Sequence, residues 1–357
     1  MRHPLLGSLV LSSCLLLACG EEAPPPAAPP PPPPVASASV ASAAPPAPET
    51  PPAAAPTPEE KKKAEAQKQL QEDRAKWEAD DKVEVARWTA DLHAAAKALA
   101  SKSTPSLKAA LKAVLASSTR RPGDVDRDKF RHPAETLDFF GIKPTMTVLE
   151  IGPGDGWYTE ILAPTLAARG KLIATNGDPN GPADSRGTFY AQRYEALLDH
   201  APELYGKVQT VVVNDKAPNL DAAGKVDAVL LMREVHGMIN GGVLDAWIGE
   251  IHKVLKPNGI LGIEDHRANP DAEPTESAKK GYVPEKWLID HLEGAGFKLA
   301  GKSEVNANPK DTKDYSEGVW ALPPTLRLGD KDRDRYVAIG ESDRMTLKFV
   351  RLPDNKK

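Results

Sequence analysis

Residues 145–156 read Thr-Met-Thr-Val-Leu-Glu-Ile-Gly-Pro-Gly-Asp-Gly. The mostly apolar first part, 145–151, predicts a short buried strand. The glycines at every second position after it predict a sharp turn into a helix over 157–168. Such a strand–turn–helix unit is typical of a parallel sheet, in which ligands lie at the carboxyl ends of the strands. The stretch therefore predicts an α/β fold with a ligand site at the glycine turn.

Strand and helix patterns continue to alternate after this stretch. Six further strands are predicted over 171–176, 207–213, 226–232, 260–265, 297–305 and 344–351, and further helices over 190–200, 242–255 and 284–295. This order predicts a doubly wound, mostly parallel, seven-stranded Rossmann-like sheet. Because no clear helix separates the last two strands, we expect an antiparallel strand at the edge of the sheet.

The glycine turn departs from the dinucleotide fingerprint, because Trp157 stands where the third glycine of that motif would lie. Glu150 precedes the first glycine by two residues. A carboxylate at this position suits a ligand with an amino-acid part, whose ammonium group it can hold through charge-assisted hydrogen bonds.

Seven motifs follow one another between Arg121 and Leu352, some two-thirds of the chain. They are 131–137 (Arg-His-Pro-Ala-Glu-Thr-Leu), the glycine turn with 156–160 (Gly-Trp-Tyr-Thr-Glu), 233–236 (Arg-Glu-Val-His), 255–259 (Leu-Lys-Pro-Asn-Gly), 265–268 (Asp-His-Arg-Ala), 306–311 (Asn-Ala-Asn-Pro-Lys-Asp) and 340–345 (Gly-Glu-Ser-Asp-Arg-Met). In these motifs the sequence resembles the class I S-adenosylmethionine-dependent methyltransferases. It is more similar still to a bacterial group of predicted methyltransferases that often carry signal peptides.

The resemblance implies S-adenosylmethionine as the cofactor and suggests which residues contact it. Its methionine part would be held by Glu150, Gly152, Gly154, Asp155 and Gly156. The ribose usually meets an acid at the end of the second strand. Here Asn176 stands at that position, and Asp178 could take the role. The adenine contact after the third strand would fall on Asp215.

Two histidines that follow predicted strands are the catalytic candidates. Methyl transfer requires positioning of the two reactants and, for a hydroxyl or amine acceptor, a base. His236 is expected on the ligand side of the sheet, where it acts as a base or as a structural histidine bonded to a backbone carbonyl. His266 follows the fifth strand and is the second candidate.

Charged neighbours of these histidines are the candidates for substrate binding. Arg233 either binds an acidic substrate or is a surface charge. Asp265 and Arg267 either shape the acceptor pocket or cap the strand in a buried ion pair. The spacing of His, Asp and Glu predicts no metal site. The long segment 306–343 is either a lid over the pocket or a plain surface loop.

The N-terminus predicts export and lipidation. The apolar run over 5–18 is too short to cross a bilayer comfortably and fits the core of a signal peptide. It ends in Leu-Leu-Ala-Cys-Gly over 16–20, which resembles the lipobox of bacterial lipoproteins. We therefore expect a lipoprotein signal peptide over 1–18, a membrane anchor through lipidated Cys19 and a location in the cell envelope. The alternative is an ordinary secretory signal or an uncleaved anchor.

Two segments separate this anchor from the body. Of the 35 prolines, 16 lie within 23–58, so 19–58 is expected to be a disordered Pro/Ala-rich linker of polyproline II character. Residues 59–118 are rich in helix formers and predict a helical stalk, which either docks on the body or recruits a partner. The methyltransferase-like domain is expected over 119–353.

The amino-acid composition excludes some classes of function. The net charge of −4 argues against nucleic-acid binding, and both cysteines lie in or beside the signal, so the body has no thiol chemistry. We expect an S-adenosylmethionine-dependent methyltransferase that acts on a small molecule. Export would separate the body from the cytoplasm, where the cofactor is made. The alternative is therefore a non-catalytic envelope lipoprotein that uses the same fold to bind a ligand or partner.

Overall fold

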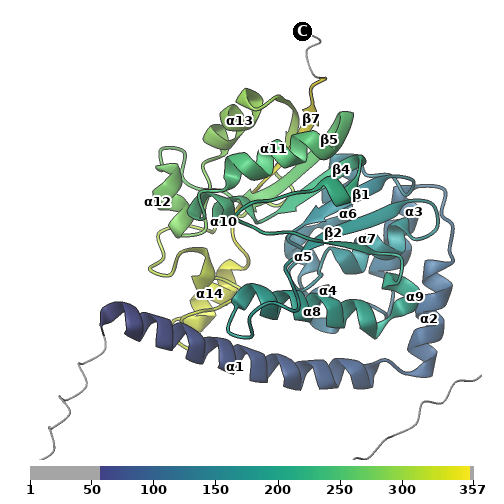
Figure 1. Cartoon of the computed structure of the whole chain (residues 1–357), viewed down its shortest axis with the longest axis horizontal. Helices are drawn as coiled ribbons and strands as arrows, with labels where there is room; N and C mark the ends of the chain where they lie inside the picture. The colour runs from purple at the N-terminus through teal and green to yellow at the C-terminus, as the bar shows by residue number, and fades with distance from the viewer. Residues whose placement is uncertain (1–56, 354–357) are drawn as a thin grey trace, which may run out of the picture. The chain divides into compact units, whose positions relative to one another are not determined.

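The computed structural model describes residues 57–353 (Figure 1). All of them belong to one compact unit, Pro56–Lys357. The predicted signal peptide, the lipid anchor at Cys19 and all but the last two residues of the predicted linker lie outside the described residues. Within 57–353, no helix combines the length and the apolar character needed to cross a membrane.

Seven strands form one sheet in the order β3-β2-β1-β4-β5-β7-β6. Their bounds are β1 (Thr147–Ile151), β2 (Lys171–Asn176), β3 (Gln209–Val212), β4 (Val226–Met232), β5 (Leu255–His266), β6 (Phe297–Ser303) and β7 (Arg344–Arg351). The first five strands pair in parallel, and β7 runs antiparallel to both of its neighbours. The predicted doubly wound, mostly parallel, seven-stranded sheet is confirmed. The expected place of the antiparallel strand is wrong, because β7 lies inside the sheet and β6 forms the edge.

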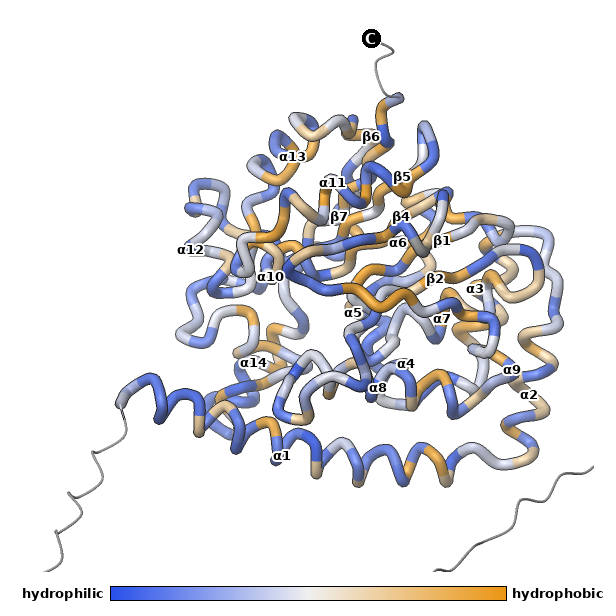
Figure 2. The backbone as a smooth tube through the Cα atoms, in the orientation of Figure 1, coloured by the Kyte–Doolittle hydropathy of each residue, from blue (hydrophilic) through white to orange (hydrophobic). Residues whose placement is uncertain are grey.

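Helices cover both faces of this sheet. The helices from residue 90 onward are α2 (Ala90–Ala100), α3 (Leu107–Leu115), α4 (Pro122–Val125), α5 (Asp128–Arg131), α6 (Pro133–Phe140), α7 (Thr159–Leu166), α8 (Arg186–His200), α9 (Pro202–Tyr205), α10 (Val235–Asn240), α11 (Leu244–Val254), α12 (Pro274–Lys279), α13 (Glu285–Gly294) and α14 (Arg333–Ile339). One face packs on α10, α11 and α13, and the other on α2, α3 and α6 to α9. Side chains of β1 alternate between them, so Leu149 enters the first core and Val148 the second. Figure 2 shows hydrophobic residues concentrated along these strands.

The N-terminal helices pack against the body. Helix α1 (Pro58–Arg87) begins with a capping box, in which the side chains of Thr57 and Glu60 each accept a hydrogen bond from the other residue's backbone. Farther along α1, Asp73 pairs with Arg186 of α8 at 2.7 Å, and α3 packs on α6 and α7. Of the two alternatives for residues 59–118, the structure shows docking on the body.

The segment between β6 and β7 has a small core of its own, formed by Tyr315, Leu322 and Tyr336. It contains a 3-10 turn over Gly318–Ala321 and helix α14. Both elements lie on the side of the molecule where α10 and α12 are found (Figure 1). The segment thereby reaches the carboxyl ends of the parallel strands.

Candidate active site

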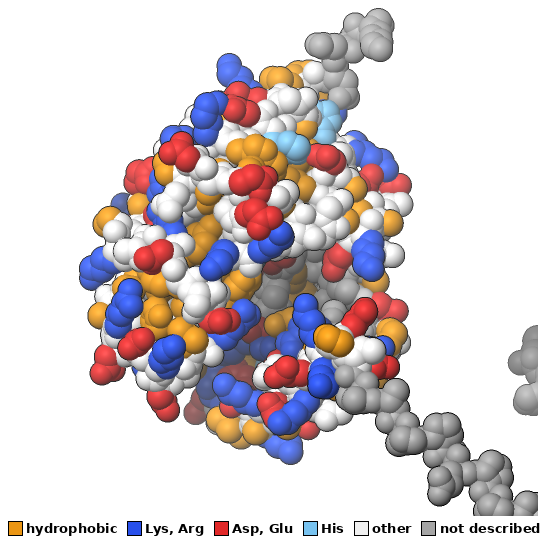
Figure 3. Space-filling model, turned by 90° about the vertical axis from the view of Figure 1, so that its left-hand side faces the viewer, with side chains coloured by type: hydrophobic (Ala, Val, Ile, Leu, Met, Phe, Trp, Pro, Cys, Tyr) orange, Lys and Arg blue, Asp and Glu red, His pale blue; other side chains and the backbone are white. Residues whose placement is uncertain are grey.

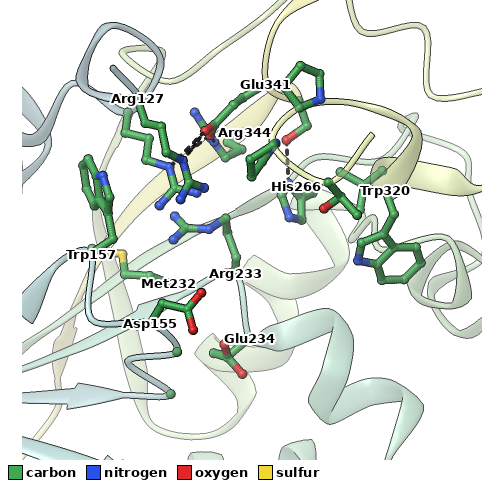
Figure 4. Close-up of a pocket in the computed structure, with 18 of the residues that line it drawn as sticks. Arg127, Asp155, Trp157, Met232, Arg233, Glu234, His266, Trp320, Glu341 and Arg344 are labelled. Carbon is green, nitrogen blue, oxygen red and sulfur yellow. Dashed lines mark hydrogen bonds and ion pairs between the residues drawn. The ribbon is translucent and has the colours of Figure 1, made fainter. Parts of the chain in front are cut away.

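A pocket of about 310 Å³ lies at the carboxyl ends of β1 and β4, where the strand order reverses (Figure 4). Five parts of the chain form its wall, namely the region of α4 and α5, the glycine turn, the residues after β4, the end of β5, and the segment between β6 and β7. The lining residues are Arg127, Arg131, Gly152, Pro153, Gly154, Asp155, Trp157, Met232, Arg233, Glu234, His236, His266, Val319, Trp320, Pro323, Pro324, Thr325, Glu341, Ser342 and Arg344. In open α/β sheets, ligands bind at such a switch point.

The glycine turn contributes bare backbone to this wall. Gly152 and Gly154 have φ of 61° and 56°, which side chains rarely adopt. A Cβ atom at Gly154 would meet nothing within 4 Å, so the space beside it is open for a ligand. Gly156 does not line the pocket, because its Cβ position lies 2.0 Å from a methyl carbon of Leu197. Gly156 therefore packs closely against α8, and its expected contact with the cofactor stays a prediction.

Glu150 does not line the pocket either. Its carboxylate accepts a hydrogen bond from Thr159 Oγ1, the first residue of α7, at 2.7 Å. Burial raises the pKa of Glu150 to about 7, although the bond from Thr159 and the charge of Arg233 act in the opposite direction. The structure thus shows Glu150 fixing the start of α7, and its predicted contact with an ammonium group stays a prediction.

The three residues predicted to contact ribose and adenine lie outside the pocket lining. Asn176 donates to the Ala191 carbonyl at 3.2 Å and accepts from its neighbour's backbone N–H. Asp178 accepts from the backbone of Asn180, and the Asp215 carboxyl has its pKa raised by burial. Asn176 and Asp178 hold local loop structure here, and the contacts of all three residues with a cofactor stay predictions.

Two carboxyl groups do lie beside the glycine turn. Asp155, which was predicted, pairs with Arg193 at 2.6 Å. Glu234, which was not predicted, lies over the turn, since a Cβ at Gly152 would fall 2.6 Å from its carboxyl carbon. Burial raises the pKa of Glu234 to about 8. A buried acid beside a bare backbone turn fits the predicted cofactor, whose ammonium and sulfonium groups carry positive charge.

His236 and His266 both line the pocket, and the carboxylate of Asp265 holds the first of them. Nδ1 of His236 donates to Asp265 Oδ1 at 3.3 Å, which leaves Nε2 free of this contact. Burial alone would lower the pKa of His236, but the bond and charge of Asp265 raise it above its usual value. Burial, followed by the charge of His236, lowers the pKa of His266 well below its usual value. His236 is therefore the stronger base of the pair.

The same three residues form a group that could ligate a metal ion. Among residues 57–353, His236, Asp265 and His266 offer ligand atoms that all lie within 4.8 Å of one another. The sequence predicted no metal site, because Asp265 lies 29 positions from His236 and only the sheet brings them together. Asp265 already accepts from the backbone N–H groups of Val235 and His266, at 2.8 and 2.7 Å. Both oxygens of Asp265 therefore accept hydrogen bonds from the backbone, and the expected absence of a metal here stays a prediction.

Of the predicted substrate-binding residues, only Arg233 lines the pocket. Asp265 is fully buried and positions His236. Of the two alternatives for Arg267, the structure shows the ion pairs, because its guanidinium group is turned toward three carboxylates. It pairs with Glu304 at 2.6 Å and with Glu285 and Asp343 at 3.2 Å each. With three carboxylates around it, Arg267 ties the end of β5 to neighbouring segments.

The segment 306–343 shapes the pocket, as one of its two predicted roles requires. Val319, Trp320 and Pro323 belong to the lining, and the ring of Trp320 meets that of His236 edge to face at 6.0 Å. Asn306, at the start of the segment, donates to Thr136 and Thr346 at 2.9 and 3.0 Å. The segment is therefore anchored beside the pocket, and its opening and closing as a lid stay a prediction.

Solved structures of several methyltransferases are similar to this chain. A SAM-dependent methyltransferase from Aquifex aeolicus shares 19% identity with a TM-score of 0.41, over 64% of this chain and 93% of that one. The glycopeptide N-methyltransferase MtfA, complexed with S-adenosylhomocysteine, shares 13% identity with a TM-score of 0.40, over 63% and 90%. At TM-scores below 0.5, neither likeness bears on the function.

Sequence comparison identifies the family. The family described as Methyltransferase domain matches residues 125–298. The ribosomal RNA large subunit methyltransferase E of Verminephrobacter eiseniae (strain EF01-2) is 35% identical over 192 residues, which cover 52% of this chain and 74% of that protein. The match includes the glycine turn, β4 and the strand-end residues that form the pocket. The chain belongs to the class I S-adenosylmethionine-dependent methyltransferases.

Proposed function

We propose that this methyltransferase acts on a small acceptor bound in the pocket and that His236 removes the acceptor's proton. The observation that carries the proposal is the position of His236 in the pocket wall, with Nδ1 held by the buried carboxylate of Asp265. A histidine oriented by a carboxylate keeps its other nitrogen available as a proton acceptor. The pocket therefore combines a bare cofactor cradle with an oriented base.

Different residues would bind the cofactor and remove the acceptor's proton. Bound S-adenosylmethionine supplies a methyl group on a positively charged sulfur that departs as a neutral thioether. Glu234 and Asp155 would face its positive charges, since both line the pocket beside the glycine turn. His236 would take the proton of an acceptor hydroxyl or amine at Nε2. Asp265 is a positioning residue that stabilises the imidazolium formed.

A small acceptor is favoured over a nucleic acid. The relative described above is named as a ribosomal RNA methyltransferase, but this chain has a net charge of −4. Proteins that bind nucleic acids usually present a strongly basic surface. A pocket of about 310 Å³ that must also receive the methionine part of the cofactor leaves room for a small molecule.

Two measurements on the full chain test the proposal. Calorimetry is expected to show binding of S-adenosylmethionine and of its demethylated product, S-adenosylhomocysteine. Labelled methyl groups are then expected to pass from the cofactor into the low-molecular-weight fraction of a cell extract. The proposal would fail if the cofactor bound but label entered only RNA, protein or no acceptor at all.

Cofactor selectivity is expected to depend on pH. Because the pKa of Glu234 is about 8, this acid is largely neutral at pH 6 and ionised at pH 9. The ionised form attracts a sulfonium group, which S-adenosylhomocysteine lacks. The preference for S-adenosylmethionine should therefore rise with pH, by at most about tenfold per unit below pH 8, and level off above it. Calorimetric titrations of both ligands across this pH range give the ratio of their affinities. Protonation of the amino group, which both ligands share, affects both affinities alike and cancels in this ratio.

Glu234→Gln is the control for this selectivity. The amide cannot ionise, so the variant should lose most of the pH dependence. Deprotonation of His236, whose positive charge also repels a sulfonium group, should account for the part that remains. An unchanged slope in Glu234→Gln would show that Glu234 does not face the sulfonium.

We also propose that the methyltransferase is a lipoprotein of the cell envelope. The lipobox-like 16–20 stretch supports lipidation at Cys19 after removal of 1–18, and the proline-rich linker supports a body held away from the membrane. Fractionation tests this: Cys19→Ala should move the chain out of the membrane fraction. Membrane association that survives the substitution would refute the lipid anchor.

A further inference from the structure

Arginine side chains gather at one end of the pocket. Arg127, Arg131 and Arg344 line it together and share the buried carboxylate of Glu341. Nε of Arg127 and Nε of Arg131 each donate to Glu341 at 3.0 Å, and Arg344 donates through Nη1. Burial would raise the pKa of Glu341, but these guanidinium charges outweigh it and lower the pKa. The carboxylate of Glu341 thus pairs with three guanidinium groups.

A second buried carboxylate completes this arrangement. Glu264, fully buried, accepts from Nη1 of Arg233 at 2.9 Å and pairs with Arg344 at 2.8 Å. Tyr158 also donates to Glu264, at 3.0 Å. The side chain of Arg233 therefore crosses from the end of β4 to the same end of the pocket (Figure 4).

Positive charge exceeds negative charge at this arginine end, which we define as Arg127, Arg131, Arg233 and Arg344. Four guanidinium groups share the carboxylates of Glu341 and Glu264, so two positive charges remain. A further carboxylate, Asp124, lies 3.6 Å from Arg127 but is held more closely by Arg121, at 2.7 Å. Burying unbalanced charge is costly unless a ligand of opposite charge compensates it.

Unused hydrogen-bond donors point to the same kind of ligand. Within residues 57–353, Arg131 bonds to protein through Nε and Arg233 through Nη1. Both Nη atoms of Arg131, and Nε and Nη2 of Arg233, make no hydrogen bond to the described chain. Arg131 is only 4% exposed, so water reaches its donors less readily than those of Arg233, whose side chain is 18% exposed. Adjacent guanidinium nitrogens match the two oxygens of a carboxylate or phosphate.

The pocket is thus polarised between its two ends. Asp155 and Glu234 lie near the glycine turn, whereas Arg127, Arg344 and Glu341 lie on the opposite side of Figure 4. Figure 3 shows a hollowed region of the surface with Lys and Arg side chains beside it. The acidic end suits the cationic cofactor, which leaves the arginine end for the other reactant.

We propose that the methyl acceptor is a small acid, whose carboxylate or phosphate group binds between Arg131 and Arg233. This inference rests on the proposed methyltransferase function and specifies the chemistry of its acceptor. Anchored there, the acceptor extends toward His236 and the glycine turn. The acid group supplies binding and orientation, while the group that receives the methyl lies at the other end of the molecule.

Anion binding tests the arginine end directly. The full chain, saturated with S-adenosylhomocysteine, is titrated calorimetrically with inorganic phosphate and, separately, with benzoate. At least one probe should bind, and the probe that binds identifies the acid. Arg233→Gln should weaken that probe by about 10- to 100-fold, the range expected for lost hydrogen bonds to a charged group. Arg233→Lys, which keeps the charge, should weaken it less.

The controls separate this inference from the proposed function. Arg335→Gln, on the exposed surface of α14, should bind the probe as wild type does. S-adenosylhomocysteine should bind Arg233→Gln normally, which shows that the variant is folded. If wild type did not bind S-adenosylhomocysteine, the proposed function would fail. Titration of the chain with phosphate and benzoate alone would still show whether the arginine end binds an anion. Absence of binding by both probes, or equal binding by wild type and Arg233→Gln, would overturn the acidic acceptor.

The natural acceptor provides a second test. A macromolecule-free cell extract is passed over an anion exchanger, and both fractions are tested for labelled methyl acceptance. The acceptor should be in the retained fraction. Phosphatase treatment before the column should release a phosphate-bearing acceptor into the flow-through and leave a carboxylic acid retained. Acceptor activity found only in the flow-through of the untreated extract would overturn the inference.

Discussion

Replacing Gly154 by valine is expected to abolish cofactor binding. Gly154 has a φ of 56°, and a β-branched side chain in this conformation is strained by roughly 1–3 kcal/mol. Its Cβ would also occupy the open space beside the turn, where the cofactor must approach the backbone. The strain lowers the stability of the variant, whereas loss of this space should weaken binding of S-adenosylhomocysteine by more than about 100-fold, which corresponds to about 2.7 kcal/mol. Calorimetry on the folded variant measures the loss.

Gly242→Val is the matched control for this substitution. Gly242 has a φ of 65°, and its Cβ position also meets nothing within 4 Å, but it does not line the pocket. The variant therefore carries the same backbone strain without filling the cofactor cradle. It should lose stability and keep its affinity for S-adenosylhomocysteine. A comparable loss of affinity in both variants would mean that strain, rather than occupied space, is responsible.

His236→Ala is expected to lower turnover by about 10²- to 10⁴-fold, the usual contribution of a general base. The measurement is labelled methyl transfer to the low-molecular-weight fraction, with the cofactor saturating. Asp265 raises the pKa of His236 above its usual value, so the wild-type rate should rise with pH as this histidine loses its proton. His236→Ala should lose that rise while still binding S-adenosylhomocysteine.

Two further variants define the role of this histidine. His291→Ala removes a partly exposed histidine of α13, which pairs with Asp245, and should leave turnover unchanged. Asp265→Asn removes the charge that raises the pKa of His236, so its pH–rate profile should shift to lower pH. Turnover in His236→Ala equal to that of wild type would show that the acceptor needs no base.

The sequence predicted the bounds of the strands better than the order in which the strands pair. β2, β4 and β7 begin and end at the predicted residues, because each is a clear run of strand-forming residues between turns. The place of β7 between β5 and β6 was missed. Pairing in a sheet depends on which partners bury the most apolar surface across the whole domain, and local patterns do not encode this. For the same reason, local sequence patterns do not reveal a site that is assembled from distant segments.

The candidate site shows this limit residue by residue. Arg233 and His236 were predicted because each follows a strand that ends at the pocket, and topology alone directs them there. Arg131 and Glu341 were missed as a pair, since 210 positions separate them and β7 must be in place before they meet. Both residues lie in motifs, 131–137 and 340–345, that carry the family resemblance but contain no predicted site residue. For Arg267 the sequence left two roles open, because position after a strand does not decide which way a side chain turns.

The interior position of β7 sets a condition on the synthesis of this protein. β7 is the last of the seven strands of this sheet to leave the ribosome, yet both β5 and β6 pair with it. Until Arg344–Arg351 arrive, these two strands expose unpaired backbone edges that can join with other chains. A chain interrupted before Arg344 would therefore be prone to aggregation and would also lack the arginine that joins Glu264 to Glu341. Synthesis of β7 thus completes the sheet and supplies Arg344 to the arginine end of the pocket.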